Sequence, residues 1–155
     1  MKYRYDTYCG LYCSACAVLI ANREGTLEES AQEWEMDPED LKCHGCKSGT
    51  MAIYCKDCDI RQCAEDNQVD FCFQCTEYPC KRLVEFRNDE SPHHSVVFQN
   101  LETIQKKGVQ KWLEEQESRW SCPECGTKFS WYDDTCKKCG TKLYNCRNEE
   151  KDIQE

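Results

Sequence analysis

The chemistry of this sequence rests on cysteine, which supplies 16 of the 155 residues. Thiolates bind zinc and iron–sulfur clusters, and thiols can also pair as disulfides. A density of about one cysteine in ten residues is typical of proteins in which a covalent or metal framework replaces part of the hydrophobic core. The spacing of the cysteines must therefore indicate which framework is present.

An internal repeat is the clearest pattern in the first part of the chain. YCKDCDIRQC (residues 54–63) and FCFQCTEYPC (residues 71–80) share the pattern aromatic-C-x2-C-x4-C, with an offset of 17 residues at every cysteine. Two thiolates separated by two residues reach one ion from a tight turn, and a third one helical turn later can close over it. The repeat predicts two equivalent sets of metal ligands: Cys55, Cys58 and Cys63, and Cys72, Cys75 and Cys80.

Two further motifs bring the upstream cysteines to eleven, an odd number that disfavours a purely disulfide framework. CGLYCSAC supplies a third trio: Cys9, Cys13 and Cys16. CHGC supplies a pair, Cys43 and Cys46, on either side of His44. We interpret these as zinc ligands and expect at least two zinc ions in residues 1–118. The role of His44 as a ligand stays open.

Iron–sulfur chemistry is the alternative to zinc. Radical S-adenosylmethionine enzymes hold a [4Fe-4S] cluster with the C-x3-C-x2-C spacing of CGLYCSAC, but they need an α/β barrel of roughly 200 residues or more, for which this chain has no room. An iron–sulfur protein of electron transfer fits the length, although neither repeated trio matches the compact cysteine run of bacterial ferredoxins. A redox switch built on releasable thiolates is a third interpretation of the upstream cysteines.

A different cysteine pattern begins after residue 119. Two C-x2-C pairs, each followed by a glycine, supply four candidate ligands: Cys122, Cys125, Cys136 and Cys139. Glycine suits the positive φ of such a turn, and Phe129, Trp131 and Tyr132 between the pairs favour strands. The pattern predicts a closed β zinc ribbon with one zinc ion in residues 119–147. Cys146 has no partner pair and is expected to be a spare thiol.

Helix signals fill the segments between the cysteines. Thr26 and Glu29 form a T-x-x-E pattern that predicts a capping box at the start of a helix. Asp37 and Pro38 read as an N-cap followed by proline at the first helical position. We expect both to begin short helices.

The longest helix is expected over residues 95–117, where apolar residues keep a three-to-four-residue spacing. Gly108 weakens it by roughly 1 kcal/mol relative to alanine. The expected fold class is a small metal-stabilised α+β protein. An irregular, α-rich, cysteine-rich zinc domain (1–118) precedes the β zinc ribbon (119–147) and a disordered tail (148–155).

The net charge of −9 is unevenly distributed. Residues 119–155 hold seven basic and seven acidic groups, so residues 1–118 hold 13 basic against 22 acidic groups. This acidic part repels phosphate backbones and is disfavoured as a nucleic-acid-binding domain. The predicted ribbon is locally basic, which leaves room for weak RNA or DNA binding there. The expected partner is a protein with a basic surface.

The remaining signals disfavour a membrane protein and an enzyme. No apolar run approaches the roughly 18 residues of a membrane span, and the N-terminus has no signal-peptide pattern, so a cytoplasmic protein is expected. No serine-hydrolase elbow, phosphate-binding glycine loop or H-E-x-x-H motif is present. His93 and His94 lie in the polar segment RNDESPHHS and are expected to be exposed.

Four motifs in order, CGLYCSAC, CHGC, CDIRQCA and CTEYPCKRL, resemble the uncharacterised bacterial and archaeal family catalogued as domain of unknown function 3795. The resemblance covers roughly residues 5–90. It implies a cysteine-rich, metal-binding domain without an assigned reaction or substrate. The sequence as a whole favours a non-enzymatic, zinc-stabilised module that recognises a protein partner.

Overall fold

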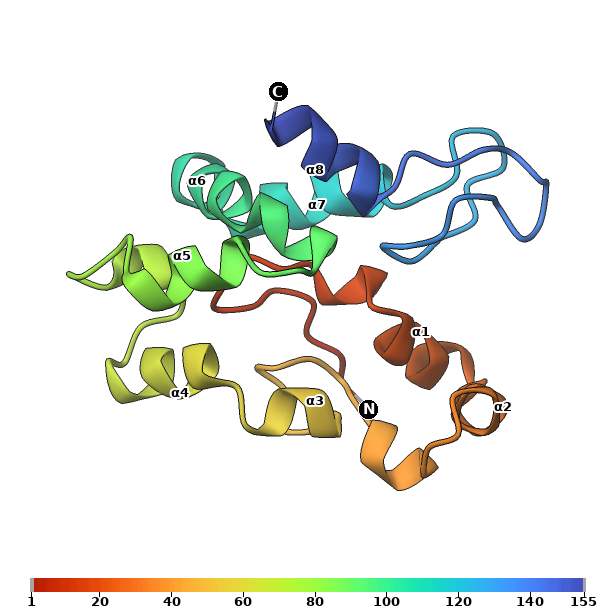
Figure 1. Ribbon diagram of the computed structural model, residues 1–155, viewed down its shortest axis with the longest axis horizontal. Coiled ribbons are helices and arrows are strands. Elements are labelled where there is room, and N and C mark those ends of the chain that lie inside the picture. Colours follow the sequence, from red (N-terminus) through yellow and green to blue (C-terminus); the bar gives the residue numbers. More distant parts are fainter. Residues whose placement is uncertain (1, 155) are drawn as a thin grey trace.

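The computed structural model describes residues 2–154, which form short helices joined by irregular segments (Figure 1). None of these helices is long and apolar enough to span a membrane. The α-helices are α1 (Ala17–Glu24), α2 (Leu27–Glu33), α3 (Ile53–Lys56), α4 (Asp59–Asp66), α5 (Lys81–Arg87), α6 (Val97–Lys107), α7 (Val109–Arg119) and α8 (Cys146–Gln154). The 3-10 helices are η1 (Cys13–Ala15), η2 (Pro38–Leu41), η3 (Cys72–Gln74) and η4 (Pro92–Val96).

The predicted α+β class is wrong, because no strand or sheet forms between residues 2 and 154. In place of the predicted β zinc ribbon, residues 119–147 contain two isolated antiparallel bridges, Ser121 with Lys128 and Thr135 with Lys142. The protein is a small cysteine-rich α protein.

The backbone between the two cysteine pairs explains why no ladder forms. The Trp131 N–H donates to the Ala15 carbonyl (3.0 Å), and the Trp131 carbonyl accepts from the Cys146 N–H (2.9 Å). These groups are thus engaged by the N-terminal part of the chain and by the start of α8. Because a β-ladder needs the same N–H and C=O groups, the aromatic segment stays irregular.

Local helix signals are realised in part. The Asp37 carboxylate accepts a hydrogen bond from the Glu39 N–H (3.0 Å), and Pro38 opens η2 as predicted. At the start of α2 the Thr26 side chain makes no capping hydrogen bond, so the predicted capping box is absent. Gly108 does more than weaken the long helix: with φ of 88° and ψ of 157° it divides the helix into α6 and α7.

One buried core contains residues from both sides of residue 119. Tyr12 packs edge-on against Trp112 of α7, with ring centroids 5.9 Å apart. Trp120 and Phe129 belong to the same core and lie 5.3 Å apart. Cys146, the expected spare thiol, is also buried there. The N-terminal segment and the downstream cysteine segment therefore share their hydrophobic stabilisation.

The tail predicted to be disordered is helical as far as the structure describes it. Residues 148–154 belong to α8, which lies against η4, while Glu155 is outside the described residues. Arg119 Nε donates to Glu149 Oε2 at 3.2 Å. This contact joins α7 to α8 and gives the polar tail a partner that composition alone does not reveal.

The N-terminal segment of residues 4–10, which contains no helix or strand, runs through the middle of the molecule (Figure 1). The Arg4 N–H donates to the His44 carbonyl (2.7 Å), and the Tyr8 carbonyl accepts from the Cys72 N–H (2.8 Å). At its end, the Gly10 carbonyl accepts from the buried Asn100 side chain of α6 (2.8 Å). The segment thereby connects three parts of the chain that are distant in sequence.

A buried ion pair reinforces this segment. Lys47 Nζ lies 3.0 Å from the Asp6 carboxylate, and both side chains are buried. Burial acts to raise the pKa of Asp6, but hydrogen bonds from Arg4 and Lys47 outweigh it and hold that pKa below its usual value. Lys47 also lies over the Phe71 ring, 3.8 Å from its centroid. Asp6 is therefore a charged anchor between CHGC and the second repeat.

Gly45 allows CHGC to approach the backbone at Arg4 closely. It has a φ of 111°, and a Cβ atom at this position would lie 1.9 Å from the Arg4 carbonyl oxygen. Any side chain there must push the N-terminal segment away from CHGC.

We expect Gly45→Ala to lower the free energy of unfolding by roughly 3 kcal/mol or more, because the clash is with backbone. Gly49→Ala is the matched control: its φ is 88°, but a Cβ atom there meets nothing within 4 Å. It should cost only about 1 kcal/mol of left-handed strain. Urea unfolding followed by tryptophan fluorescence measures both, and equal losses would contradict the close-approach argument.

His93 is half-buried, contrary to the expectation that it would be exposed in a polar loop. Its ring stacks on Trp131 with centroids 4.2 Å apart, and its Nδ1 lies 2.6 Å from the Tyr132 hydroxyl. Burial, with a smaller contribution from His94, lowers the pKa of His93 to about 3. The neutral imidazole therefore joins η4 to the downstream cysteine segment.

This lowered pKa predicts acid sensitivity. The unfolded chain takes up a proton on His93 near pH 6.5 while the folded protein does not, so stability falls as pH falls from about 6.5 towards 3. At pH 5 the loss relative to pH 7.5 is about 2 kcal/mol. Urea unfolding at both pH values should show a smaller loss for His93→Gln than for the wild type. Identical pH dependence in the two proteins would contradict this.

Candidate metal centre

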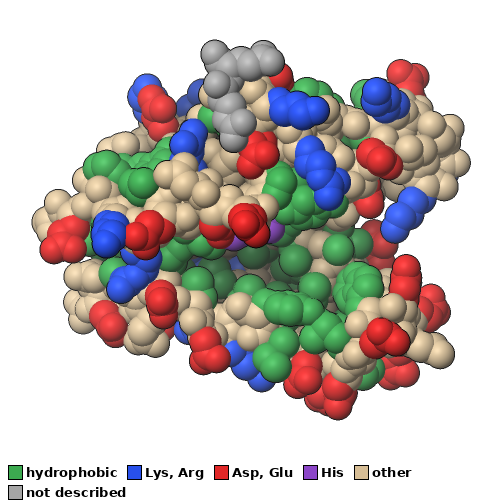
Figure 2. Space-filling model, viewed as in Figure 1, with side chains coloured by type: hydrophobic (Ala, Val, Ile, Leu, Met, Phe, Trp, Pro, Cys, Tyr) green, Lys and Arg blue, Asp and Glu red, His purple; other side chains and the backbone are tan. Residues whose placement is uncertain are grey.

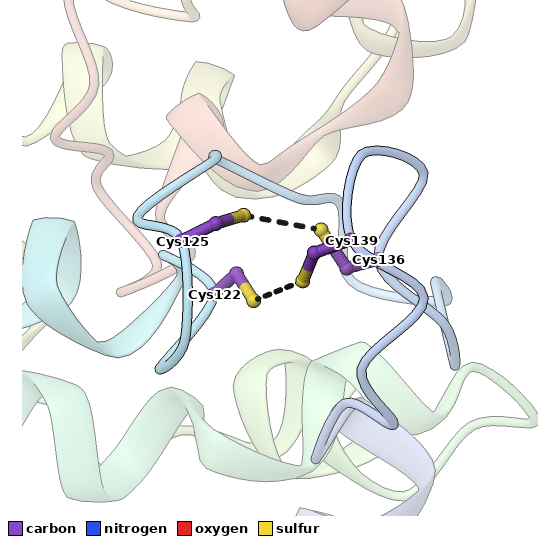
Figure 3. Close-up of side chains that lie close together, drawn as sticks. All are labelled: Cys122, Cys125, Cys136 and Cys139. Atoms are coloured by element: carbon purple, nitrogen blue, oxygen red, sulfur yellow. Dashed lines mark hydrogen bonds between the residues drawn. The ribbon is translucent and has the colours of Figure 1, made fainter.

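Four thiols converge at the downstream cysteine segment (Figure 3). Their Sγ atoms all lie within 4.8 Å of one another, and the Cys122–Cys139 and Cys125–Cys136 Sγ distances are both 3.6 Å. Four sulfurs placed tetrahedrally at about 2.3 Å from one zinc ion are about 3.8 Å apart. A disulfide would need about 2.05 Å. The spacing therefore fits a shared metal ion, and all sixteen cysteines are free.

Two identical turns position the four sulfurs. In the first, the Cys122 N–H donates to the Thr127 carbonyl (2.8 Å) and the Gly126 N–H to the Cys122 carbonyl (2.9 Å). The second turn repeats both bonds with the same lengths, fourteen residues later, at Cys136, Gly140 and Thr141. Each glycine has a φ of 78°, a left-handed conformation that glycine adopts more readily than any other residue. Each turn thus presents its two thiols on one side.

Two threonines act on the exposed thiols. Thr127 Oγ1 lies 3.2 Å from Cys125 Sγ, and Thr141 Oγ1 lies 3.0 Å from Cys139 Sγ. The hydrogen bond with the Thr127 side chain, followed by one with its backbone, lowers the pKa of Cys125 to about 6. The Thr141 side chain and backbone lower the pKa of Cys139 in the same way. Both thiols are thereby shifted towards the thiolate, the form that binds metal.

Sequence reasoning missed these threonines, although a signal for them exists. CPECGTK and CKKCGTK share the tripeptide Gly-Thr-Lys directly after the second cysteine. An exact continuation of a repeat beyond its ligands indicates that the following residues belong to the same structural unit.

The upstream cysteines are arranged differently. Among residues 2–154, the downstream four are the one group of three or more Cys, His, Asp or Glu side chains with all ligand atoms within 4.8 Å. The structure does not bring the other predicted ligands into such a group: Cys9, Cys13, Cys16, Cys43, Cys46, Cys55, Cys58, Cys63, Cys72, Cys75 and Cys80. Their metal sites stay predictions.

Several upstream thiols are nevertheless neighbours. Cys13, Cys16 and Cys43 pack together around Leu19 of α1. Burial raises the pKa of Cys13 well above its usual value, and the nearby Cys46 raises it further. These four cysteines come from CGLYCSAC and CHGC, so the two motifs meet in space.

The second repeat forms another neighbourhood. Burial raises the pKa of Cys72 to about 12, with further contributions from Cys9 and Cys80. Cys9, Cys72 and Cys80 also pack against the same buried core. His44, whose role as a ligand was left open, stacks edge-on against Tyr3 with ring centroids 4.8 Å apart.

Comparison with known proteins gives one match. The family model described as "Protein of unknown function (DUF3795)" matches residues 5–85, the part of the chain that carries the upstream motifs. No curated protein and no solved structure matches the chain. The four-cysteine centre lies outside the matched residues.

The threonines make the centre testable. We expect Thr127→Val and Thr141→Val each to weaken zinc binding about 10- to 100-fold, because loss of a hydrogen bond to a ligand raises the thiol pKa. Competition with a chromophoric chelator measures the affinity. Thr103→Val, which removes a hydroxyl on α6 bonded to the Gln99 carbonyl, is the matched control and should have no effect. Unchanged affinity in both test variants would contradict the assignment.

Proposed function

Because the chain belongs to the DUF3795 family of proteins of unknown function, we propose its role from its own residues: a zinc-binding, non-enzymatic module that recognises a protein partner. The convergence of four cysteine Sγ atoms within 4.8 Å carries the zinc part of the proposal. Four thiolates fill the tetrahedral positions of zinc, and such closed sites stabilise folds because no position is open for a substrate.

The proposed zinc ion fastens the downstream segment to the rest of the chain. The residues between its two cysteine pairs include Phe129, which is buried in the core, and Trp131, which stacks on His93 and bonds to Ala15. Closing the pairs around one ion fixes these aromatic residues in position. Zinc thus supplies stability that a segment of this size lacks by itself.

We extend the proposal to at least two zinc ions in residues 1–118, in the two neighbourhoods of upstream cysteines. Support comes from the packing of Cys13, Cys16 and Cys43 around Leu19, and of Cys9, Cys72 and Cys80 on the main core. The presence of sixteen free cysteines supports a reducing compartment such as the cytoplasm.

A protein partner is favoured by the charge of the first 118 residues. Their acidic excess repels nucleic acid and attracts basic surfaces. The four-cysteine centre is assigned no reaction, since a saturated zinc ion has no position at which to bind and polarise a substrate.

Metal content and its consequence for folding test the zinc part together. Protein purified anaerobically should contain about three or more zinc ions per chain and no iron. Cys125→Ser/Cys139→Ser should lose about one of these ions and should lose hydrogen-exchange protection in residues 119–145. The control variant Thr103→Val should keep its full zinc content and its hydrogen-exchange protection.

Two outcomes would overturn the zinc proposal. Iron with acid-labile sulfide would replace it with the iron–sulfur alternative. Zinc content that is unchanged in the double cysteine variant would remove the four-cysteine centre from the proposal.

A further inference from the structure

An exposed apolar surface lies at the end of α2 and on α3. The large side chains there are unusually accessible: Trp34 is 37% exposed, Ile53 46% and Tyr54 65%. The Tyr54 hydroxyl lies 2.7 Å from Met36 Sδ, which brings the two elements together. Figure 2 shows this face, where hydrophobic side chains gather at the lower right and acidic side chains border them. We call Trp34, Met36, Ile53 and Tyr54 the aromatic surface.

Exposure of these side chains contributes nothing to the stability of the fold. α3 has four residues, and none of them is buried. So short a helix gains little stability from its own hydrogen bonds. Burying its apolar side chains against a partner would contribute about 25 cal/mol of free energy for each Å² of apolar surface removed from water. Contiguous exposed apolar residues with a polar border are characteristic of binding sites.

The border of the aromatic surface is strongly acidic. Residues 24–40 hold eight Asp and Glu residues and no Lys or Arg, which is almost the whole net charge of the chain. Among the described residues, Glu24 and Glu39 pair with Arg23 and Lys42. The remaining six form no ion pair there: Glu28, Glu29, Glu33, Glu35, Asp37 and Asp40. Apart from the Asp37 oxygen that accepts the capping hydrogen bond of η2, these carboxylate oxygens are therefore available to cations from outside.

Glu35 gives a second indication of a specific role. It adopts a φ of 57°, a left-handed conformation that costs a non-glycine residue about 1 kcal/mol. This turn closes α2 through the Met36 N–H, which donates to the Ala31 carbonyl (2.9 Å), and directs the chain back so that Met36 meets Tyr54. Glycine would suit the turn better, yet the sequence places a carboxylate beside the apolar residues.

We propose that the aromatic surface and its acidic border bind a short basic and apolar segment of a partner protein. This rests on the proposed function and specifies the surface and the chemistry of the partner. Arginine or lysine side chains would pair with the six carboxylates and lie on the Trp34 or Tyr54 rings, while apolar side chains would cover Ile53 and Met36. Anionic partners such as nucleic acid or acidic membranes would be repelled.

A fluorescent peptide of alternating arginine and leucine is the probe, and a peptide with glutamate in place of arginine is its control. Fluorescence anisotropy with the full zinc-loaded chain should show binding of the first peptide only, weakening as salt is raised. Trp34→Ser and Tyr54→Ser should each weaken binding about tenfold or more, because exposed aromatic anchors carry most of the affinity of such surfaces. Tyr144→Ser changes another exposed aromatic residue, 47% accessible, and should have no effect.

Glu35→Gly separates binding from folding. It should weaken peptide binding by removing a carboxylate, while raising thermal stability by relieving the left-handed strain. Gln68→Gly is the matched control: its φ is 56°, at the end of α4, so it should raise stability without changing binding.

The outcomes distinguish this inference from the proposed function. The assigned surface would be overturned if Trp34→Ser and Tyr54→Ser left the affinity for the arginine–leucine peptide unchanged. It would also be overturned if the glutamate peptide bound with equal affinity. The absence of binding in a chain whose zinc content is complete would overturn it as well, and that result would leave the zinc centre standing. Selective binding by a chain that contains no zinc when purified anaerobically would support the surface and overturn the zinc centre instead.

Discussion

The N-terminal segment of residues 4–10 is the constraint on which the other parts of the molecule depend. Its backbone hydrogen bonds reach CHGC at His44, the second repeat at Cys72 and, through Asn100, helix α6. The described residues form no sheet, so these hydrogen bonds join segments that are distant in sequence, as a β-ladder does in other proteins. Because they cross between distant parts of the sequence, they bring the cysteine motifs of the family into one region.

The approach at Gly45 and the buried pair of Asp6 and Lys47 make that constraint specific. A hydrogen bond alone would allow the segment to shift. The absence of a side chain at Gly45 lets CHGC approach the Arg4 carbonyl more closely than a Cβ atom would permit, and the Asp6–Lys47 ion pair adds a second contact between the same two segments. CGLYCSAC and CHGC therefore meet around Leu19. The structure thus explains how small motifs far apart in sequence come to share one neighbourhood.

The downstream four-cysteine centre follows a different principle. Its two turns are nearly self-contained, since each is closed by two backbone hydrogen bonds and a left-handed glycine. Aromatic side chains join these turns to the remainder of the protein. Trp131 and Tyr132 contact His93, and Phe129 is buried beside Trp120. A locally determined centre is in this way fastened to a core that long-range contacts determine.

The sequence by itself determined the features that depend on short-range spacing. It identified the family from four ordered motifs, grouped the four downstream cysteines, placed the turn at Asp37 and Pro38 and located the negative charge. Two thiols two residues apart, a proline and a glycine act within a single turn, so their effect can be read from neighbouring residues.

Only the tertiary structure decided the rest. Phe129, Trp131 and Tyr132 suggest strands by type, but the Trp131 backbone bonds to Ala15 and Cys146. By composition His93 lies in a polar loop, yet its ring stacks on Trp131. By composition the tail carries no structural signal, yet its Glu149 pairs with Arg119. Each of these outcomes depends on a partner distant in sequence, which local residue preferences do not specify.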